Sequence, residues 1–312
     1  RHDYIVDIIE SYDNGYLICG YYNSPDYSER WGWLIKTDVN GETIWEKIIE
    51  NTGSRFKPAS IEQNLNGEIF IVGMSFHNNK NYPIVLKLNA CGEKEWCKIF
   101  DGSPMLSPWS QDIKITPEGD IIILVNLFGS FPEESIHLFK LNSNGGVLWK
   151  KPFGIIQNHP GSEHKIGRNL LVTSDEKYLI SGYGFWENPW GPANFYIKRP
   201  LFILVDSHGN EEWVTPFGLN DSILGSAKNV MESSLSTFIS VGFKMVGPLD
   251  HGLLMEFDIN GNELNYSTFD FSSLNSNFNE GIFHHLANKD SLFLIASFFG
   301  NSSWANSIPP GE

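Results

Sequence analysis

A short sequence pattern recurs five times at nearly regular intervals, and this repetition constrains the fold more than any other feature of the chain. Each copy starts with an apolar run, continues through an Asp or Asn and a glycine, and ends on an aromatic residue. The copies span residues 34–45, 86–96, 139–149, 205–213 and 257–266. Intervals of 51, 53, 64 and 53 residues separate their final aromatics, which are Trp45, Trp96, Trp149, Trp213 and Tyr266. A period of this length is typical of a repeat architecture.

A second hairpin alternates with the first along the chain. Its turns lie near residues 14, 66, 118, 176, 236 and 290, and each one precedes an apolar segment. Pairs such as Asn66-Gly67 supply the positive φ angles that tight hairpin turns require. Two hairpins per period give four strands per unit, which is the composition of a propeller blade.

The sequence therefore predicts an all-β fold, a β-propeller of about six four-stranded blades forming a single domain over residues 1–312. No stretch shows a helical period. The blades are expected at about 2–50, 58–101, 110–153, 164–217, 225–270 and 279–312. The last copy has no recognisable second hairpin, so either the polypeptide continues past Glu312 or the last blade is incomplete.

The recurring tryptophan is predicted to pack between neighbouring blades. An enclosed indole ring buries something like 150–250 Å², which corresponds to about 4–6 kcal/mol as an upper bound. The segments 68–72 and 120–125 are apolar without alternation, as expected of strands covered on both faces.

The pattern Lys-x-Asp/Asn-x-Asn-Gly-x-x-x-Trp, with hairpins of the type Gly-Tyr-Leu-Ile-x-Gly between its copies, resembles the repeat of bacterial exported β-propeller proteins. It is also similar to the tryptophan-docking repeat of quinoprotein-like propellers, which include outer-membrane assembly scaffolds. The resemblance covers nearly the whole chain. It implies a secreted or envelope propeller of the Bacteroidota type, and it says little about activity because propellers host many functions.

Composition narrows the classes of partner. Lys and Arg total 22 against 37 Asp and Glu, so the net charge is −15. Such a surface repels phosphate backbones and anionic lipids, and binding to nucleic acid is not expected. No apolar run approaches the roughly 18 residues of a membrane span.

Several features favour an exported protein of the bacterial periplasm, outer-membrane surface or exterior. The chain opens directly on a strand pattern, as a mature or trimmed product would. Its acidic composition is rich in Asn, Tyr and Trp and poor in Lys and Arg. Cys19, Cys91 and Cys97 form no disulfide framework. Cys91 and Cys97 could pair across a hairpin but are expected to be unpaired, so the cysteines constrain the redox compartment only weakly.

In a four-stranded blade, the turns between strands one and two and between strands three and four lie on one face. The other connections lie on the opposite face, and here they are long and rich in aromatics. Such loops are the usual binding face of a repeat protein. We expect this face to recognise a protein partner or a glycan, with the candidate contact residues Tyr22, Arg30, Trp31, Trp109, Trp186, Trp190 and Tyr196. The alternative is that these rings only pack beneath the loops.

A second candidate group lies near the mouth of the expected central channel. Alignment of the repeats places small polar residues at one equivalent position of the first strands, namely Asp7, Ser60, Asp112, Asn169 and Asn229, with Gly281 in the last copy. They could bind a water, an ion or a polar ligand. Alternatively, they satisfy backbone donors at each strand start.

No catalytic motif is present, and no cofactor or metal site is expected. Asp38, Asp206 and Asp258 are predicted to form turns. A cluster of Arg30, Arg55, Arg168 and Arg199 on the loop face could bind an anion. The leading hypothesis is a non-enzymatic binding or scaffold propeller. The alternative is a carbohydrate-active enzyme, a glycosidase or lyase, that uses acids among Asp7, Glu62, Asp112 and Glu280.

Overall fold

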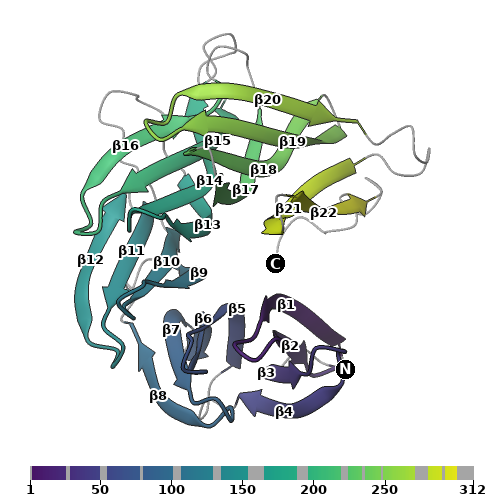
Figure 1. Cartoon of the computed structure of the whole chain (residues 1–312), viewed down its shortest axis with the longest axis vertical. Coiled ribbons are helices and arrows are strands. Elements are labelled where there is room, and N and C mark those ends of the chain that lie inside the picture. Colours follow the sequence, from purple (N-terminus) through teal and green to yellow (C-terminus); the bar gives the residue numbers. More distant parts are fainter. Residues whose placement is uncertain are drawn as a thin grey trace. The chain divides into compact units, whose positions relative to one another are not determined.

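A computed structural model describes most of the chain as antiparallel β-sheet (Figure 1). The described residues are 2–25, 29–49, 55–77, 80–100, 107–128, 135–153, 165–187, 196–218, 224–233, 236–246, 249–270, 280–289 and 292–300. They contain strands and turns and no helix, so the predicted all-β class is confirmed. The chain divides into two compact units, residues 1–153 and residues 154–312.

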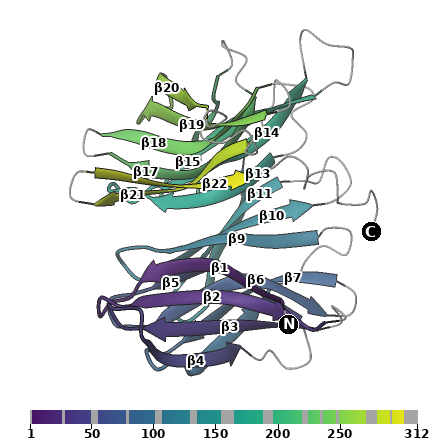
Figure 2. The same cartoon turned by 90° about the vertical axis from the view of Figure 1, so that its right-hand side faces the viewer.

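Unit 1 contains three four-stranded sheets in which consecutive strands are neighbours. Sheet 1 is formed by β1 (His2–Glu10), β2 (Tyr16–Asn23), β3 (Arg30–Thr37) and β4 (Thr43–Ile49), which lie side by side in Figure 2. Sheet 2 is formed by β5 (Arg55–Gln63), β6 (Ile69–His77), β7 (Lys80–Leu88) and β8 (Lys94–Ile99). Sheet 3 is formed by β9 (Ser107–Ile115), β10 (Ile121–Phe128), β11 (Ser135–Leu141) and β12 (Val147–Phe153).

Unit 2 repeats this order twice and then adds a hairpin. Sheet 4 is formed by β13 (Lys165–Val172), β14 (Tyr178–Glu187), β15 (Tyr196–Val205) and β16 (Glu211–Pro216). Sheet 5 is formed by β17 (Gly225–Glu232), β18 (Thr237–Val246), β19 (Leu249–Asp258) and β20 (Glu263–Phe269). The hairpin of β21 (Glu280–Lys289) and β22 (Leu292–Gly300) joins β19 through one parallel bridge between Asp250 and Glu280.

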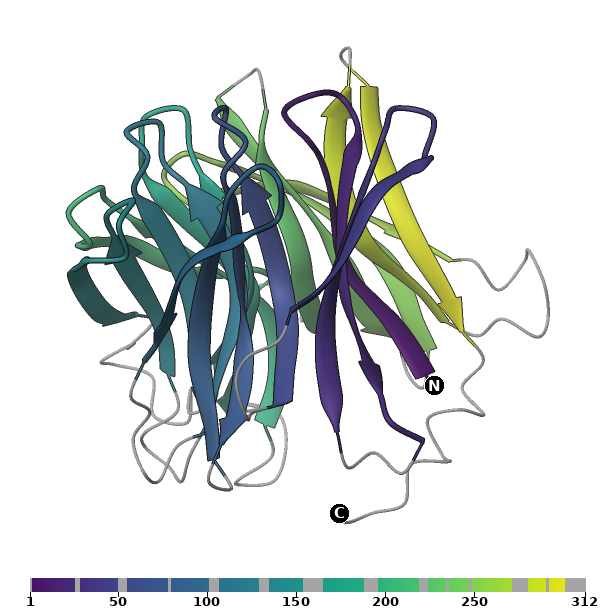
Figure 3. The ribbon, with the colours of Figure 1, turned by 90° about the horizontal axis from the view of Figure 1, so that it is seen from below.

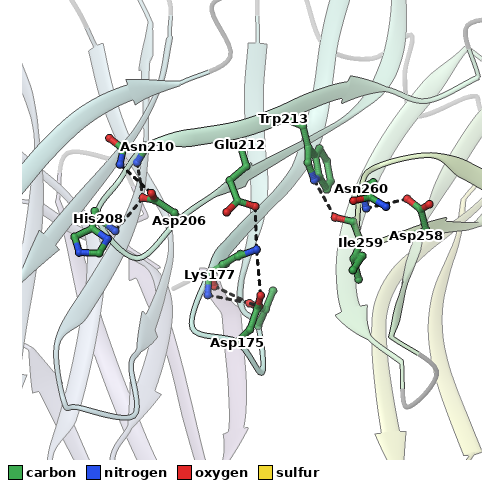
Figure 4. Close-up of polar contacts among 11 residues, drawn as sticks. Asp175, Lys177, Asp206, His208, Asn210, Glu212, Trp213, Asp258, Ile259 and Asn260 are labelled. Atoms are coloured by element: carbon green, nitrogen blue, oxygen red, sulfur yellow. Dashed lines mark hydrogen bonds and ion pairs between the residues drawn. The ribbon is translucent and has the colours of Figure 1, made fainter.

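The turn between the third and fourth strands is built the same way in all five sheets. In sheet 4, the Oδ1 atom of Asp206 accepts hydrogen bonds from the backbone nitrogens of His208 and Asn210, at 2.9 and 2.7 Å (Figure 4). Gly209 follows with a φ of +78°, a backbone conformation that favours glycine. Asp38, Asn89, Asn142 and Asp258 make the equivalent pair of bonds. The predicted turn role of Asp38, Asp206 and Asp258 is therefore confirmed.

The lysine of the repeated pattern ties the two turns of its sheet together. Lys36, Lys87 and Lys140 reach acids in or beside the turn between strands one and two, which are Asp13, Glu68 and Asp120. In sheet 4, Leu204 stands at this position in the sequence. In this sheet the lysine comes from the turn between strands one and two: Lys177 pairs with Glu212 of the fourth strand at 3.0 Å (Figure 4).

The repeated tryptophan lies on the turn of the next sheet. A Cβ atom added to Gly92 would approach Trp45 to 3.0 Å, and one added to Gly145 would approach Trp96 to 3.2 Å. In unit 2, Trp213 donates a 3.0 Å hydrogen bond from Nε1 to the carbonyl oxygen of Ile259 (Figure 4). These rings are half-buried and pack at the edge of cores that lie between successive sheets. They therefore bury less area than a fully enclosed ring.

Every first strand carries one β-bulge at the same place. The pairing of β1 with β2 shifts between Ile5 and Asp7, and the pairing of β13 with β14 shifts between Gly167 and Asn169. Equivalent shifts occur in β5, β9, β17 and β21. A bulge adds one residue and re-aims side chains. The residue after the bulge in β21 is His285, so the alignment that placed Gly281 at this repeat position was wrong.

Candidate functional site

The candidate contact residues gather at the end of the sheets opposite the tight turns. Because consecutive strands are antiparallel, the end of the second strand and the start of the first strand lie at the same end of a sheet. Within each unit, the turns lie together at the other end (Figure 3). Tyr22, Arg30 and Trp31 occupy this loop end of sheet 1, and Trp109 occupies it in sheet 3.

Lys57 is the centre of the aromatic group in unit 1. Its ammonium nitrogen lies 5.5 Å from the ring centroid of Tyr21 and 4.5 Å from that of Trp109, which belong to the two sheets flanking its own. The guanidinium of Arg30 lies 5.0 Å from the Tyr21 ring, and Tyr4 stacks on Tyr21 at 4.9 Å. Cations at these distances are attracted to the ring faces. Trp109 remains 36% exposed.

A pocket of about 90 Å³ opens beside Lys57. Arg30, Arg55 and Lys57 line it together with Met74, Phe76 and Asn81, and no acidic side chain lies among these lining residues. Burial lowers the pKa of Lys57, and the neighbouring charge of Arg30 lowers it further. The Arg30 side chain is held by a 2.8 Å hydrogen bond from Nε to Oδ1 of Asn23. We call Tyr21, Arg30, Arg55, Lys57 and Trp109 the Lys57 surface.

Two other predicted contact residues form a pair on the opposite face of sheet 1 from Tyr21 and Arg30, because successive side chains of a strand alternate between its two faces. Tyr22 and Trp31 face each other across β2 and β3, with ring centroids 4.9 Å apart and an interplanar angle of 26°. Both rings are half-buried. Sheet 1 therefore carries aromatic side chains on both faces at its loop end.

The polar residues of the repeated first-strand position form a network in unit 1. The Ser60 hydroxyl lies 2.9 Å from Oδ2 of Asp7 and 3.0 Å from Oδ1 of Asp112, so it links three sheets. Asp7 accepts the backbone N–H of Ile61 in the next sheet at 3.0 Å. Burial raises the pKa of Asp7, and the charge of Asp112 acts in the same direction.

A second pair of charges completes this network. Lys114 donates to Oε1 of Glu62 at 2.5 Å and lies 3.6 Å from Oδ1 of Asp112. Although burial alone would lower it, the carboxylates of Asp112 and Glu62 hold the pKa of Lys114 above its ordinary value. Burial raises the pKa of Glu62. Asp7, Glu62 and Asp112 are thus engaged with hydrogen-bond donors within unit 1. The side chain of Glu280, the fourth acid considered for catalysis, lies outside the described part of the structure.

In unit 2 the repeated position shows the same contact between sheets. Oδ1 of Asn169 accepts the backbone N–H of Val230 at 3.0 Å, as Asp7 does for Ile61. Asn229 accepts a 2.7 Å hydrogen bond on its backbone carbonyl from Ser240. The bond to Asn169 is the one expected if the repeated polar side chains satisfy backbone donors, whereas the bond to Asn229 involves only its backbone carbonyl. A bound ligand at this position stays a prediction.

Three cations meet two aromatic rings in unit 2. Lys198 lies 4.0 Å from the ring centroid of Tyr183 and 4.9 Å from that of Phe243. Arg168 lies 5.4 Å from the Tyr183 ring, and Lys228 lies 5.6 Å from the Phe243 ring. We call these five residues the Lys198 cluster. Sheet 4 supplies Arg168, Tyr183 and Lys198, and sheet 5 supplies Lys228 and Phe243.

The predicted arginine cluster is divided by the structure. Arg30 and Arg55 line the pocket of unit 1, and Arg168 joins the Lys198 cluster of unit 2. Arg199 is only 2% exposed and donates from Nη1 to the carbonyl oxygen of Gly218 at 2.5 Å, which is a structural role.

The long insertion of sheet 4 is described only at its two ends. Trp186 pairs with Ile197, and Tyr196 pairs with Glu187, where β14 meets β15. Trp190 lies outside the described residues. The contact roles of Trp186, Trp190 and Tyr196 stay predictions.

Sequence reasoning missed Lys57, Lys198 and Lys228. One sequence signal was available for the ring residues, because Tyr21, Tyr183 and Phe243 each directly follow a glycine within the second strand of their sheet. Lys228 and Arg168 occupy the extra position of a bulge, which depends on strand pairing and carries no sequence mark of its own.

The described part of the chain contains no group of three or more His, Cys, Asp or Glu residues that could hold a metal ion. Cys19, Cys91 and Cys97 are all free thiols. Among the described residues, no helix is long and apolar enough to cross a bilayer.

No protein-family model and no curated protein matches the chain by sequence. Solved structures match it by fold. An ulvan lyase, a polysaccharide lyase bound to -[GlcA(1-4)Rha3S]-, is 8% identical with a TM-score of 0.61, and the match covers 93% of this chain and 75% of that one. The β-propeller domain of the Trilobed protease from Pyrococcus furiosus is 10% identical with a TM-score of 0.52, over 96% and 78% of the two chains.

An α-L-arabinofuranosidase of Fusarium graminearum, solved with arabinobiose, is 12% identical with a TM-score of 0.53, over 96% of this chain and 94% of that one. Across eight matched structures, the chain spans between 55% and 94% of the other protein's length. Identities this low establish the fold alone. Together with the repeated four-stranded sheets, these similarities show that the chain has the β-propeller fold.

Proposed function

We propose that the chain is a carbohydrate-binding propeller, without catalytic activity, that holds an acidic sugar on the Lys57 surface. The observation that carries the proposal is the position of Lys57 between two aromatic rings, beside a pocket lined by three cations. Aromatic rings offer large contact area to the apolar face of a sugar. Arginine matches a carboxylate or sulfate group with paired hydrogen bonds.

Two further points support a carbohydrate over other ligands. A molecule with a net charge of −15 repels long polyanions such as nucleic acids, whereas a local cationic pocket can still hold a single charged group. Carbohydrate-active proteins are among the structures that share the fold, including one bound to an acidic disaccharide unit. The proposal includes export from the cell, which the composition favours.

The proposal is tested by affinity electrophoresis in gels that contain polygalacturonate, dextran sulfate or neutral dextran. We expect the acidic polymers to retard the protein and neutral dextran to have little effect. Replacing Lys57 by Gln or Trp109 by Ala should weaken binding about tenfold, since either change removes roughly 1.4 kcal/mol of contact energy. Replacing the exposed Lys94 by Gln removes the same charge elsewhere and should leave binding unchanged.

Retardation that is equal in all three gels, or equal losses in Lys57→Gln and Lys94→Gln, would contradict this role. The protein would then be better explained as a scaffold that binds a protein partner through its aromatic loop end.

Cleavage of a glycan is the second candidate function. Its support is the closeness of Asp7 and Asp112, whose carboxylates share the Ser60 hydroxyl, together with the raised pKa of Asp7. Paired acids at short separation are the usual machinery of retaining glycosidases. Reducing ends released from either acidic polymer, and abolished by Asp112→Asn, would establish this activity in place of simple binding.

A further inference from the structure

The Lys198 cluster concentrates positive charge in an acidic protein. In addition to burial, the charge of Arg168 lowers the pKa of both Lys198 and Lys228, the charge of Lys198 also lowers that of Lys228, and Asp250 is the acid whose charge acts on both lysines. Within the described part of unit 2, three cations thus face one carboxylate, that of Asp250. An arrangement that only served stability would pair each cation with an acid, because unpaired like charges repel.

Three strands, β13, β15 and β17, bring these three cations close together. Arg168 and Lys228 each occupy the extra position of a first-strand bulge, in β13 and β17. The corresponding residues of unit 1 are uncharged, namely Val6, Ala59 and Gln111. Lys198 enters from β15 and lies between the two rings.

The cluster also contains a donor without a partner. The Nε atom of Arg168 is buried and makes no hydrogen bond to any described residue. A buried donor left unpaired costs free energy, which a ligand oxygen would recover. Tyr183 and Phe243, 8% and 7% exposed, form an apolar floor that keeps the cations from being fully hydrated.

We propose that the Lys198 cluster is a second anion site, which binds one carboxylate or sulfate group through Arg168, Lys198 and Lys228. That the group is carried by a carbohydrate rests on the function proposed above. The recognition of the oxyanion itself depends only on the cations of unit 2. A carboxylate and a sulfate ester present the same oxygen acceptors, so the probes must separate them.

Protonation should control this site. Burial lowers the pKa of Lys198 and of Lys228 to about 8, and the charge of Arg168 contributes to both shifts. Among the described residues, the charges that act on the two lysines are those of Arg168 on β13, Lys198 on β15, Lys228 on β17 and Asp250 on β19. Lys244 on β18 lies instead against the ring of Tyr266. Both lysines are charged below pH 8 and lose their protons above it, so affinity should fall as the pH rises.

The test measures dissociation constants of the full chain for polygalacturonate, dextran sulfate, dextran and inorganic sulfate at pH 7 and pH 9.5. We expect binding of at least one acidic polymer to weaken about tenfold or more at the higher pH. Replacing Lys228 by Gln should weaken binding at pH 7 by about tenfold. The matched control Lys244→Gln, in the same unit, should have no effect.

The double variant with Lys198→Arg and Lys228→Arg keeps both charges at high pH. It should bind at pH 7 and lose most of the pH dependence, which a merely structural role of the lysines would not produce. Polygalacturonate and dextran sulfate distinguish the carboxylate from the sulfate.

Three results would overturn the inference. These are equal losses in Lys228→Gln and Lys244→Gln, an unchanged pH dependence in the double arginine variant, and binding of inorganic sulfate alone, which would mark an adventitious ion only. If Lys57→Gln abolishes binding and Lys228→Gln does not, the inference fails while the function proposed for unit 1 stands. If Lys228→Gln abolishes binding and Lys57→Gln does not, the function proposed for the Lys57 surface fails while the anion site at the Lys198 cluster stands.

Discussion

At the scale of single residues, a few side chains decide local structure by hydrogen bonds to their own backbone. Asp206 accepts two backbone N–H groups and a third contact from the Asn210 amide at 2.8 Å. These bonds hold the pKa of Asp206 below its ordinary value although partial burial opposes them. Asn89 and Asn142 make the same backbone bonds in sheets 2 and 3, so the turn needs a side-chain oxygen and not a charge.

This comparison gives a prediction for the turn of sheet 4. Asp206→Ala should lower the free energy of unfolding by about 1–2 kcal/mol, because two backbone donors lose their acceptor. Asp206→Asn should cost only a fraction of that, since asparagine fills the position elsewhere in the chain. Urea denaturation followed by circular dichroism measures both variants. Equal losses in the two would show that the charge, and not the oxygen, forms the turn.

At the scale of elements, the hairpins could be predicted because turn chemistry is local. Asp, Asn and Gly at fixed offsets mark each turn, and the following Trp marks the fourth strand. The bulges could not be predicted, because a bulge is an extra residue in one strand relative to its neighbour, and the pairing of the two strands is not visible in the sequence. Gly281 was misaligned for this reason, and Lys228 was overlooked.

The tryptophan contact between sheets gives an element-scale prediction. Trp96 packs against Phe70 with ring centroids 6.3 Å apart and lies over Gly145 of the next sheet. Trp96→Ala should cost about 3 kcal/mol, at the low end for loss of a large aromatic because the ring is half-buried.

Trp96→Phe is the matched control for this contact and should cost clearly less. Gly145→Ala should also destabilise, because it adds a Cβ at a φ of +79° against the Trp96 ring. A midpoint of thermal unfolding for Trp96→Ala within a degree of the unmodified chain would mean that the ring does not join the sheets.

At the scale of the whole molecule, the lysines at the two ends of the sheets have different neighbours. Most lysines at the turn end pair with acids, as Lys36, Lys87 and Lys177 do. At the loop end of the sheets, Lys57, Lys198 and Lys228 lie against aromatic rings instead. The candidate site could therefore be predicted from the sequence only in its aromatic residues and not in its lysines. The sequence pattern marks aromatic residues at the loop end, whereas the cations beside them come together only through the packing of neighbouring sheets.

The decisive measurement for acidic-sugar binding is a crystal structure of the chain with a short oligogalacturonide. We expect a sugar ring against Tyr21 or Trp109, and a carboxylate within hydrogen-bonding distance, about 2.7–3.2 Å, of Lys57 or of the Lys198 cluster. A sugar held at Asp7 and Asp112 instead, or no bound sugar at a concentration that saturates binding in solution, would contradict this expectation.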